Sequence, residues 1–127
     1  MVTPNFSWAE LACKCGCDAP PKVRDRALEL AQQLEVIRAE VRGPVQVISG
    51  YRCEARNRKV GGAPNSRHLW GDAADIQVHG WAGRDLRELA ELLIGRGALR
   101  NGGIGTYAKK PLTLHYDLRS IAARWHH

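Results

Sequence analysis

Apolar residues at helical spacing predict two amphipathic helices. Between residues 23 and 42 they recur every three or four positions, which places them along one side of a helix. These positions are Val23, Ala27, Leu30, Ala31, Leu34, Ile37 and Val41, and Gly43-Pro44 follows them as a stop signal. A second helix is predicted over residues 84–97, with glycines at its C-terminal end. Ser7 and Glu10 have the spacing of a capping box, so a short helix is expected to begin there.

Short β-branched or alternating segments predict four strands. "VQVIS" (45–49) and "ADIQV" (74–78) are two of them, and "GGIGTY" (102–107) with "LTLHYDL" (112–118) forms a hairpin. In the last strand Leu112, Leu114, Tyr116 and Leu118 alternate with Thr113, His115 and Asp117. The order helix, strand, loop, strand, helix, strand, strand predicts an α+β fold with helices packed on a mainly antiparallel sheet.

The bulk composition favours a single globular domain over residues 1–127. The chain is 44% apolar and 25% charged, and no apolar run approaches the roughly 20 residues that span a bilayer. The N-terminus has no basic segment followed by an apolar stretch, so no secretory signal is recognised and synthesis in the cytoplasm is expected unless a leader has been removed. We expect a monomer without a membrane partner. His126 and His127 resemble the start of a purification tag, and no function is assigned to them.

Positive charge is concentrated in one segment of a chain whose net charge is +6. Five basic residues lie between positions 52 and 67, where Glu54 is the only acid: Arg52, Arg56, Arg58, Lys59 and Arg67. Such a patch favours polyanions, either nucleic acid or an anionic cell wall, unless it is simply a solvated face. Nucleic acid is the weaker choice, because no aromatic residues are interleaved with these charges.

The four cysteines leave three possibilities open. Cys13, Cys15 and Cys17 alternate in "CKCGC", which does not match the two-residue spacers of common zinc knuckles, and Cys53 is distant in sequence. A disulfide from one of the three to Cys53 suits an oxidising compartment, whereas free thiols suit the cytosol. A small structural metal site is the third possibility.

The stretch "NSRHLWGDAADIQV" (65–78) holds the candidate chemistry. His68 precedes the predicted strand and Asp75 lies at its start, so both can contribute to a zinc site, with small residues at 71, 73 and 74 allowing close approach of the backbone. His115 is the best third ligand, because it shares a strand face with Thr113 and Asp117. The alternative is that this face is exposed to solvent. His79, in an expected exposed turn, is the weaker candidate.

These residues resemble the zinc D-alanyl-D-alanine carboxypeptidase family, whose relatives include L-alanyl-D-glutamate endolysins, vancomycin-resistance D,D-dipeptidases and the Hedgehog signalling domain. The resemblance rests on "SGYR" (49–52), on S-x-H-x-x-G-x-A-x-D over residues 66–75, and on a late strand histidine. "FSWAELACKCGC", "VGGAPNSRH" and "GGIGTY" are similar to the short, often phage-borne branch, so the resemblance covers nearly the whole chain. It implies a fold of the Hedgehog and D-Ala-D-Ala carboxypeptidase type.

The resemblance also implies roles for individual residues. His68, Asp75 and His115 would bind one Zn²⁺ per chain. Arg52 would contact a substrate carbonyl or carboxylate and help zinc to stabilise the oxyanion, and Ser66 would lie at the substrate site and support the ligand loop. Many relatives have an acidic residue or histidine as catalytic base three positions before the last ligand, but this chain has Leu112 there. Asp117 is the candidate for that base or for a partner of His115, and Asp72 is expected to be a solvated loop residue.

The function implied is that of a zinc peptidase that hydrolyses peptidoglycan stem peptides or cross-links at the bacterial cell wall. Endolysin-like endopeptidase and D,D-carboxypeptidase activity both stay open, as does the bond that is cleaved. The alternative is a non-catalytic zinc module of the same fold, which the leucine at position 112 favours.

Overall fold

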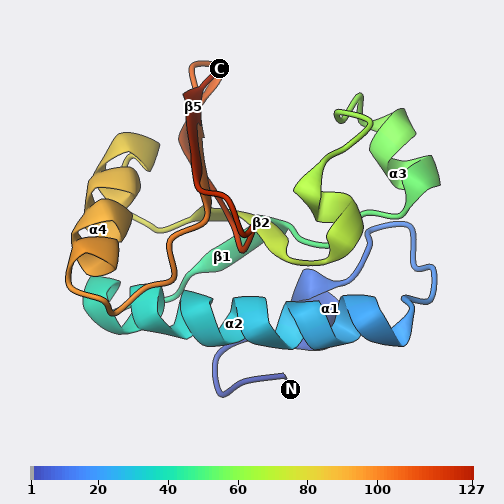
Figure 1. The fold of residues 1–127 in the computed structure, drawn as a ribbon, viewed down its shortest axis with the longest axis horizontal. Helices are drawn as coiled ribbons and strands as arrows, with labels where there is room; N and C mark the ends of the chain where they lie inside the picture. The colour runs from blue at the N-terminus through green and yellow to red at the C-terminus, as the bar shows by residue number, and fades with distance from the viewer. Residues whose placement is uncertain (1) are drawn as a thin grey trace.

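The computed structural model describes residues 2–127 and has an α+β fold (Figure 1). Its helices are α1 (Trp8–Leu11), α2 (Pro21–Val41), α3 (Glu54–Lys59), the 3₁₀ turn η1 (Arg67–Trp70) and α4 (Gly83–Gly95). Its strands are β1 (Gln46–Ser49), β2 (Ala73–Gln77), β3 (Gly103–Tyr107), β4 (Lys110–Asp117) and β5 (Ala123–His126). The sheet order is β1-β2-β4-β3-β5, antiparallel throughout except for the parallel pair β3 and β5. The predicted fold class is confirmed.

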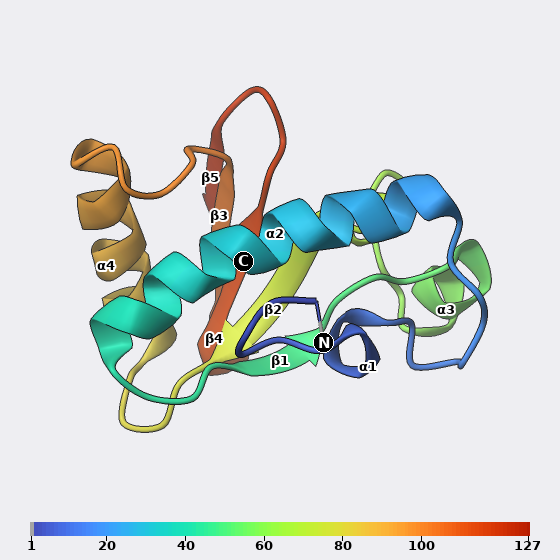
Figure 2. The same cartoon turned by 90° about the horizontal axis from the view of Figure 1, so that it is seen from below.

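The long helix α2 crosses the sheet and supplies much of the core (Figure 2). Its predicted apolar stripe is buried except for Val41, which is half-buried. Leu30 and Leu34 belong to the same buried cluster as Ile76, Leu114 and Tyr116 of the sheet. The apolar stripe of α4 packs against β3 and β4, which completes this core. The hydrophobic spacing therefore predicted both the helices and their buried sides.

The ends of α1 and α2 follow from particular residues. Ser7 and Glu10 form the predicted capping box at the start of α1. The helix α2 starts at Pro21, because a proline at the first helical position loses no intrahelical hydrogen bond. It ends at Val41, because the following residue Arg42 has a left-handed backbone with a φ of 54°. No helix among residues 2–127 is long and apolar enough to cross a membrane.

Three elements differ from the sequence-based expectation of loops. The basic segment after Cys53 forms α3, and His68 lies on the single turn η1. The C-terminal residues form β5, whose His126 has its Nδ1 atom 2.8 Å from the hydroxyl of Thr106 in β3. His126 therefore has a structural place in the sheet. A four-residue edge strand pairing with β3 through non-local hydrogen bonds leaves no periodic signal in the sequence.

Candidate metal centre

The register of the sheet brings Asp75 and His115 together. The strands β2 and β4 are antiparallel, and Asp75 pairs directly with His115, so the two side chains are neighbours on one face. Nδ1 of His115 lies 3.1 Å from Oδ1 of Asp75. Tyr107, on β3, donates its hydroxyl hydrogen to the same oxygen at 3.3 Å. The pairing of β2 with β4 thus holds Asp75 and His115 side by side although they are distant in the sequence.

His68 reaches this face from η1. Ser66 caps that turn by accepting a hydrogen bond from the His68 backbone N–H at 3.2 Å. The His68 ring donates from Nδ1 to the carbonyl of Gly50 at 2.7 Å, because a carbonyl can only accept. Nε2 therefore has no proton in the neutral ring. It is buried, lies 3.3 Å from Oδ2 of Asp75, and has no hydrogen-bond partner among the described residues.

Asp117 determines the tautomer of the His115 ring. Its side chain is fully buried and accepts hydrogen bonds from the Gly103 backbone N–H at 3.1 Å and from the Arg119 guanidinium at 2.7 Å. Burial alone would raise the pKa of Asp117, but hydrogen bonds from His115 and Arg119 outweigh it and hold that pKa well below the usual range. Because Asp117 is a carboxylate, the His115 ring donates to it from Nε2 at 2.7 Å. The unprotonated nitrogen of His115 is then Nδ1.

When both rings are neutral, each aims a lone pair at the Asp75 carboxylate, which is unfavourable unless a proton or a cation lies between them. Burial alone would lower the pKa of His115, but its hydrogen bonds with Asp117 and Asp75 outweigh burial and raise that pKa, so without a metal a proton on His115 serves this purpose. Burial alone would raise the pKa of Asp75, but the contacts of His115 and His68 outweigh it and hold that pKa well below the usual range. The two nitrogens and a carboxylate oxygen lie within 4.8 Å of one another. Two imidazoles and a carboxylate are a zinc donor set. The residues thus fit the metal that the sequence predicted.

A cleft of about 610 Å³ opens over these three residues. Its wall carries four cationic side chains, Arg52, Arg67, Lys110 and Arg119. Within residues 2–127, Asp75 is the only acidic residue that lines it. The cleft is therefore suited to an anionic ligand.

Arg52, the predicted substrate contact, lines the cleft. Its Nη2 donates to the Ser66 hydroxyl at 3.1 Å, and its backbone N–H donates to the carbonyl of His68. Nε is buried and has no hydrogen-bond partner in the described part of the chain. Leu112 is 54% exposed and lines a different hollow, beside Gln77 and Trp81. The residue that replaces the base of many relatives therefore does not line this cleft.

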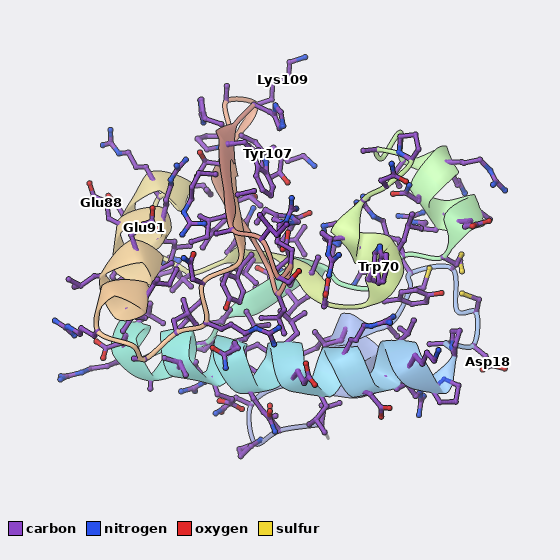
Figure 3. All side chains as sticks on the ribbon, viewed as in Figure 1. Asp18, Trp70, Glu88, Glu91, Tyr107 and Lys109 are labelled. Carbon is purple, nitrogen blue, oxygen red and sulfur yellow. The ribbon has the colours of Figure 1, made fainter. Side chains whose placement is uncertain are left out.

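Sequence reasoning missed Tyr107, Arg119 and Trp125 as cleft residues. The Trp125 ring lies 4.9 Å from the His115 ring, and the Arg119 guanidinium lies 4.9 Å from the Trp125 ring. Gly105 makes room for it, because a Cβ at that position would collide with the Trp125 ring. In Figure 3, Tyr107 projects from β3 toward the side of the molecule that carries α3. The glycines of "GGIGTY" were the available signal for this close approach.

The structure corrects two expectations and excludes one alternative. Asp72 is not solvated: it is buried and accepts hydrogen bonds from the Arg67 guanidinium, so Arg67 is not a free charge of the basic patch. The polar face of β4 is not solvent-exposed, since Thr113, His115 and Asp117 are 2%, 4% and 0% exposed. A glycine is required at position 71 by the backbone and by the contact with α2, and not by close approach of the backbone to a metal. Gly71 has a φ of +85°, and a Cβ there would lie 2.7 Å from Cγ1 of Val23 in α2.

Comparison with known proteins gives consistent matches. A sequence model of the family described as Peptidase M15 matches residues 4–113. The zinc D-Ala-D-Ala carboxypeptidase of Streptomyces albus G is 37% identical over 79 residues, covering 57% of this chain and 31% of that protein. The peptidoglycan L,D-endopeptidase MepK of Escherichia coli (strain K12) is 38% identical over 81 residues, covering 60% of this chain and 41% of that protein. The aligned segment spans less than half the length of either relative.

Proposed function

This chain belongs to the peptidase M15 family, and from that premise we propose that it is a zinc-dependent peptidase that hydrolyses peptide bonds of the peptidoglycan stem peptide or cross-link. One observation carries the proposal: Nε2 of His68 and Nδ1 of His115, the ring nitrogens that Gly50 and Asp117 do not engage, face the half-buried carboxylate of Asp75 at the floor of a cationic cleft. The names of the relatives, a carboxypeptidase and a peptidoglycan endopeptidase, support the substrate class. The bacterial cell wall would then be the place of action.

His68, Asp75 and His115 would hold the metal through Nε2, a carboxylate oxygen and Nδ1. When bound, zinc lowers the pKa of water toward about 7 and polarises a carbonyl group. The protein fixes both rings before binding, through Gly50 on one side and Asp117 on the other. Little ordering is left for the moment of binding, which favours a high metal affinity.

Arg52 would position the substrate. The hydrogen bond from Nη2 to Ser66 fixes the direction of its guanidinium, and the backbone N–H of Arg52 is held by the carbonyl of His68. A planar guanidinium offers two parallel N–H groups to a carboxylate or a single carbonyl. Stem peptides carry carboxylates, so the cationic wall formed with Lys110 suits them. Arg67 and Arg119 contribute less, because Asp72 and Asp117 already pair with them.

Asp117 has the geometry of a residue that positions His115. Both of its oxygens accept hydrogen bonds and its side chain has no exposed surface. A carboxylate held this firmly in its ionised form is a weak proton acceptor, because its pKa lies far below neutral pH. Of the two roles considered for Asp117, the partner of His115 is therefore the one we propose.

A second candidate function follows from the lining of the cleft. Because Asp75 is the only acid that lines it within residues 2–127, no separate carboxylate there is free to accept a proton. This favours a non-catalytic zinc module that binds the wall without cleaving it.

Incubation with isolated peptidoglycan separates the two candidates. The purified chain is expected to release stem-peptide fragments detected by mass spectrometry, to stop releasing them with a chelator, and to resume when zinc is added. His68→Ala is expected to be inactive, whereas His79→Ala, an exposed histidine outside the cleft, keeps full activity. Zinc-loaded protein that sediments with several wall types and releases no fragment from any of them would establish the binding module instead.

A further inference from the structure

Four sulfur atoms converge at a place remote from the cleft. The Sγ atom of Cys13 lies 3.2 Å from that of Cys15 and 3.7 Å from that of Cys53, and Cys15 and Cys53 are 3.5 Å apart. All four sulfurs, including that of Cys17, lie within 4.8 Å of one another. Figure 3 shows the yellow sulfur atoms gathered between the loop after α1 and the beginning of α3.

The spacing of the sulfurs matches a shared ion. Zinc–thiolate bonds are about 2.3 Å long, so the sulfurs of a tetrahedral site are about 3.8 Å apart. A disulfide would instead bring two sulfurs to about 2.05 Å and leave the remaining thiols outside the pair. The three separations among Cys13, Cys15 and Cys53, at 3.2, 3.7 and 3.5 Å, are somewhat shorter than the tetrahedral edge and far longer than a disulfide bond. The cysteines therefore form one four-membered cluster and not two pairs.

The surrounding backbone supports thiolates. The Cys53 backbone N–H points to the Cys13 sulfur at 3.5 Å, and such donors stabilise a metal-bound thiolate. Gly16, with a φ of +79°, turns the chain and donates to the carbonyl of Cys13, which lets alternate cysteines face one centre. Four thiolates around one divalent ion leave net negative charge. Lys14, between two of these cysteines, and the basic helix α3, directly after Cys53, offset it.

We propose that Cys13, Cys15, Cys17 and Cys53 bind a structural zinc ion, separate from the one in the cleft. Four protein ligands leave no position for substrate, so this ion joins segments and performs no chemistry. The chain would then bind two zinc ions, and not the one that the sequence suggested.

The cluster links the N-terminal loop to the segment that carries Arg52. The Tyr51 backbone N–H donates to the carbonyl of Leu11 at 2.8 Å, and Tyr51 packs with Cys13 and Val23 in a small buried group. Gly50, whose carbonyl orients His68, lies directly against Leu11, where a Cβ would collide with the backbone. The structural zinc would therefore fix the support of Arg52 and His68 from outside the cleft.

Metal analysis of purified full-length chains tests this. The wild type and the control Asp18→Ser are expected to hold two zinc ions per chain, whereas His68→Ala and the double variant Cys15→Ser/Cys53→Ser should each hold one. Asp18 is exposed in the same loop and its side chain is not one of the proposed ligands. After cobalt replaces zinc, His68→Ala should keep the thiolate-to-cobalt charge-transfer absorption and the cysteine variant should lose it. That spectrum is independent of peptidase activity, so it separates this site from the one in the cleft.

Two results would overturn the proposal. One is an unchanged zinc content in the cysteine variant. The other is protection of the cysteines from alkylation that is reversed by a reductant but not by a chelator, which identifies disulfides. If the cysteine variant does not fold, the wild type suffices: a thiol-specific mercurial must release one of its two zinc ions, and release of none contradicts the site.

Discussion

At the scale of single residues, each imidazole of the metal centre has one nitrogen already committed to the protein. Gly50 accepts from Nδ1 of His68, and Asp117 accepts from Nε2 of His115. The two rings therefore offer different nitrogens to the ion. Both are buried, with 2% and 4% of their surface exposed, so neither can exchange these partners for water. The partner of each ring matters for metal affinity as much as the ring itself.

The substitution Asp117→Asn tests the role of this residue as a partner of His115. The amide would keep the shape of the side chain but remove the charge that holds Nε2 of His115 protonated. We expect zinc affinity to fall by about 10–100-fold, measured by competition with a chromogenic chelator. Asp18→Asn, at an exposed position, is the control and should leave affinity unchanged.

The same variant distinguishes the two roles considered for Asp117. A residue that only positions His115 should lose activity largely in proportion to lost metal, and saturating zinc should restore most of it. Loss of a general base should instead leave zinc affinity intact while the acidic limb of the pH–rate profile disappears. That second pattern would contradict the role proposed here.

At the scale of elements, the close contact between η1 and α2 depends on one glycine. Gly71 ends η1 with a φ of +85°, and a Cβ there would lie 2.7 Å from Val23 Cγ1 and 2.9 Å from the Val23 carbonyl oxygen. Both the left-handed backbone conformation and the lack of space beside Val23 disfavour a side chain at this position. The turn that carries His68 is thereby held against the long helix.

Gly71→Ala is expected to lower the free energy of unfolding by about 3 kcal/mol, measured by urea denaturation. Left-handed strain contributes about 1–2 kcal/mol and displacement of α2 the rest. Gly80→Ala is the matched control: Gly80 has a φ of +83° but open space around its Cβ position, so only the strain applies. Equal losses for the two variants would show that the contact with Val23 has no energetic weight.

Periodic elements were predictable and non-local ones were not. The spacing of α2 and the alternation of β4 follow directly from which side chains are buried, and alternation placed His115 and Asp117 on one face. Nothing local indicates β5, whose hydrogen bonds are made with β3, or α3, where Asn57 is the single buried residue and holds the Ala63 carbonyl. Trp125 was missed for the same reason.

Part of the candidate site could be inferred from the sequence because its spacing is local. His68 and Asp75 lie in one signature, and His115 lies in a clear strand. Arg119 and Tyr107 enter the cleft only through the sheet register and the chain that returns to β5. The burial of Asp72 depends on its ion pair with Arg67, which hydropathy cannot reveal.

At the scale of the whole molecule, two unequal hydrophobic clusters divide the fold. The main core joins α2, α4 and the sheet, whereas the second buried cluster consists of Cys13, Val23 and Tyr51. The region containing α3 and η1 thus buries little apolar surface. Figure 1 shows this region at the opposite end of α2 from α4. Both proposed metal sites have ligands in it or at its border.

Removal of metal should therefore loosen one part of the molecule and spare the rest. A ligand present at 100 times its dissociation constant stabilises the state that binds it by about 2.7 kcal/mol, so its loss raises local opening about 100-fold. We expect a chelator to accelerate amide hydrogen exchange by about that factor over residues 51–70. The amides of α2 and β4 have the large core to protect them and should exchange as before. The control is the same protein with zinc restored. Equal acceleration of exchange along the whole chain would mean that the metal sites stabilise the whole fold. The region around the Cys13, Val23 and Tyr51 cluster would then not unfold independently of the main core.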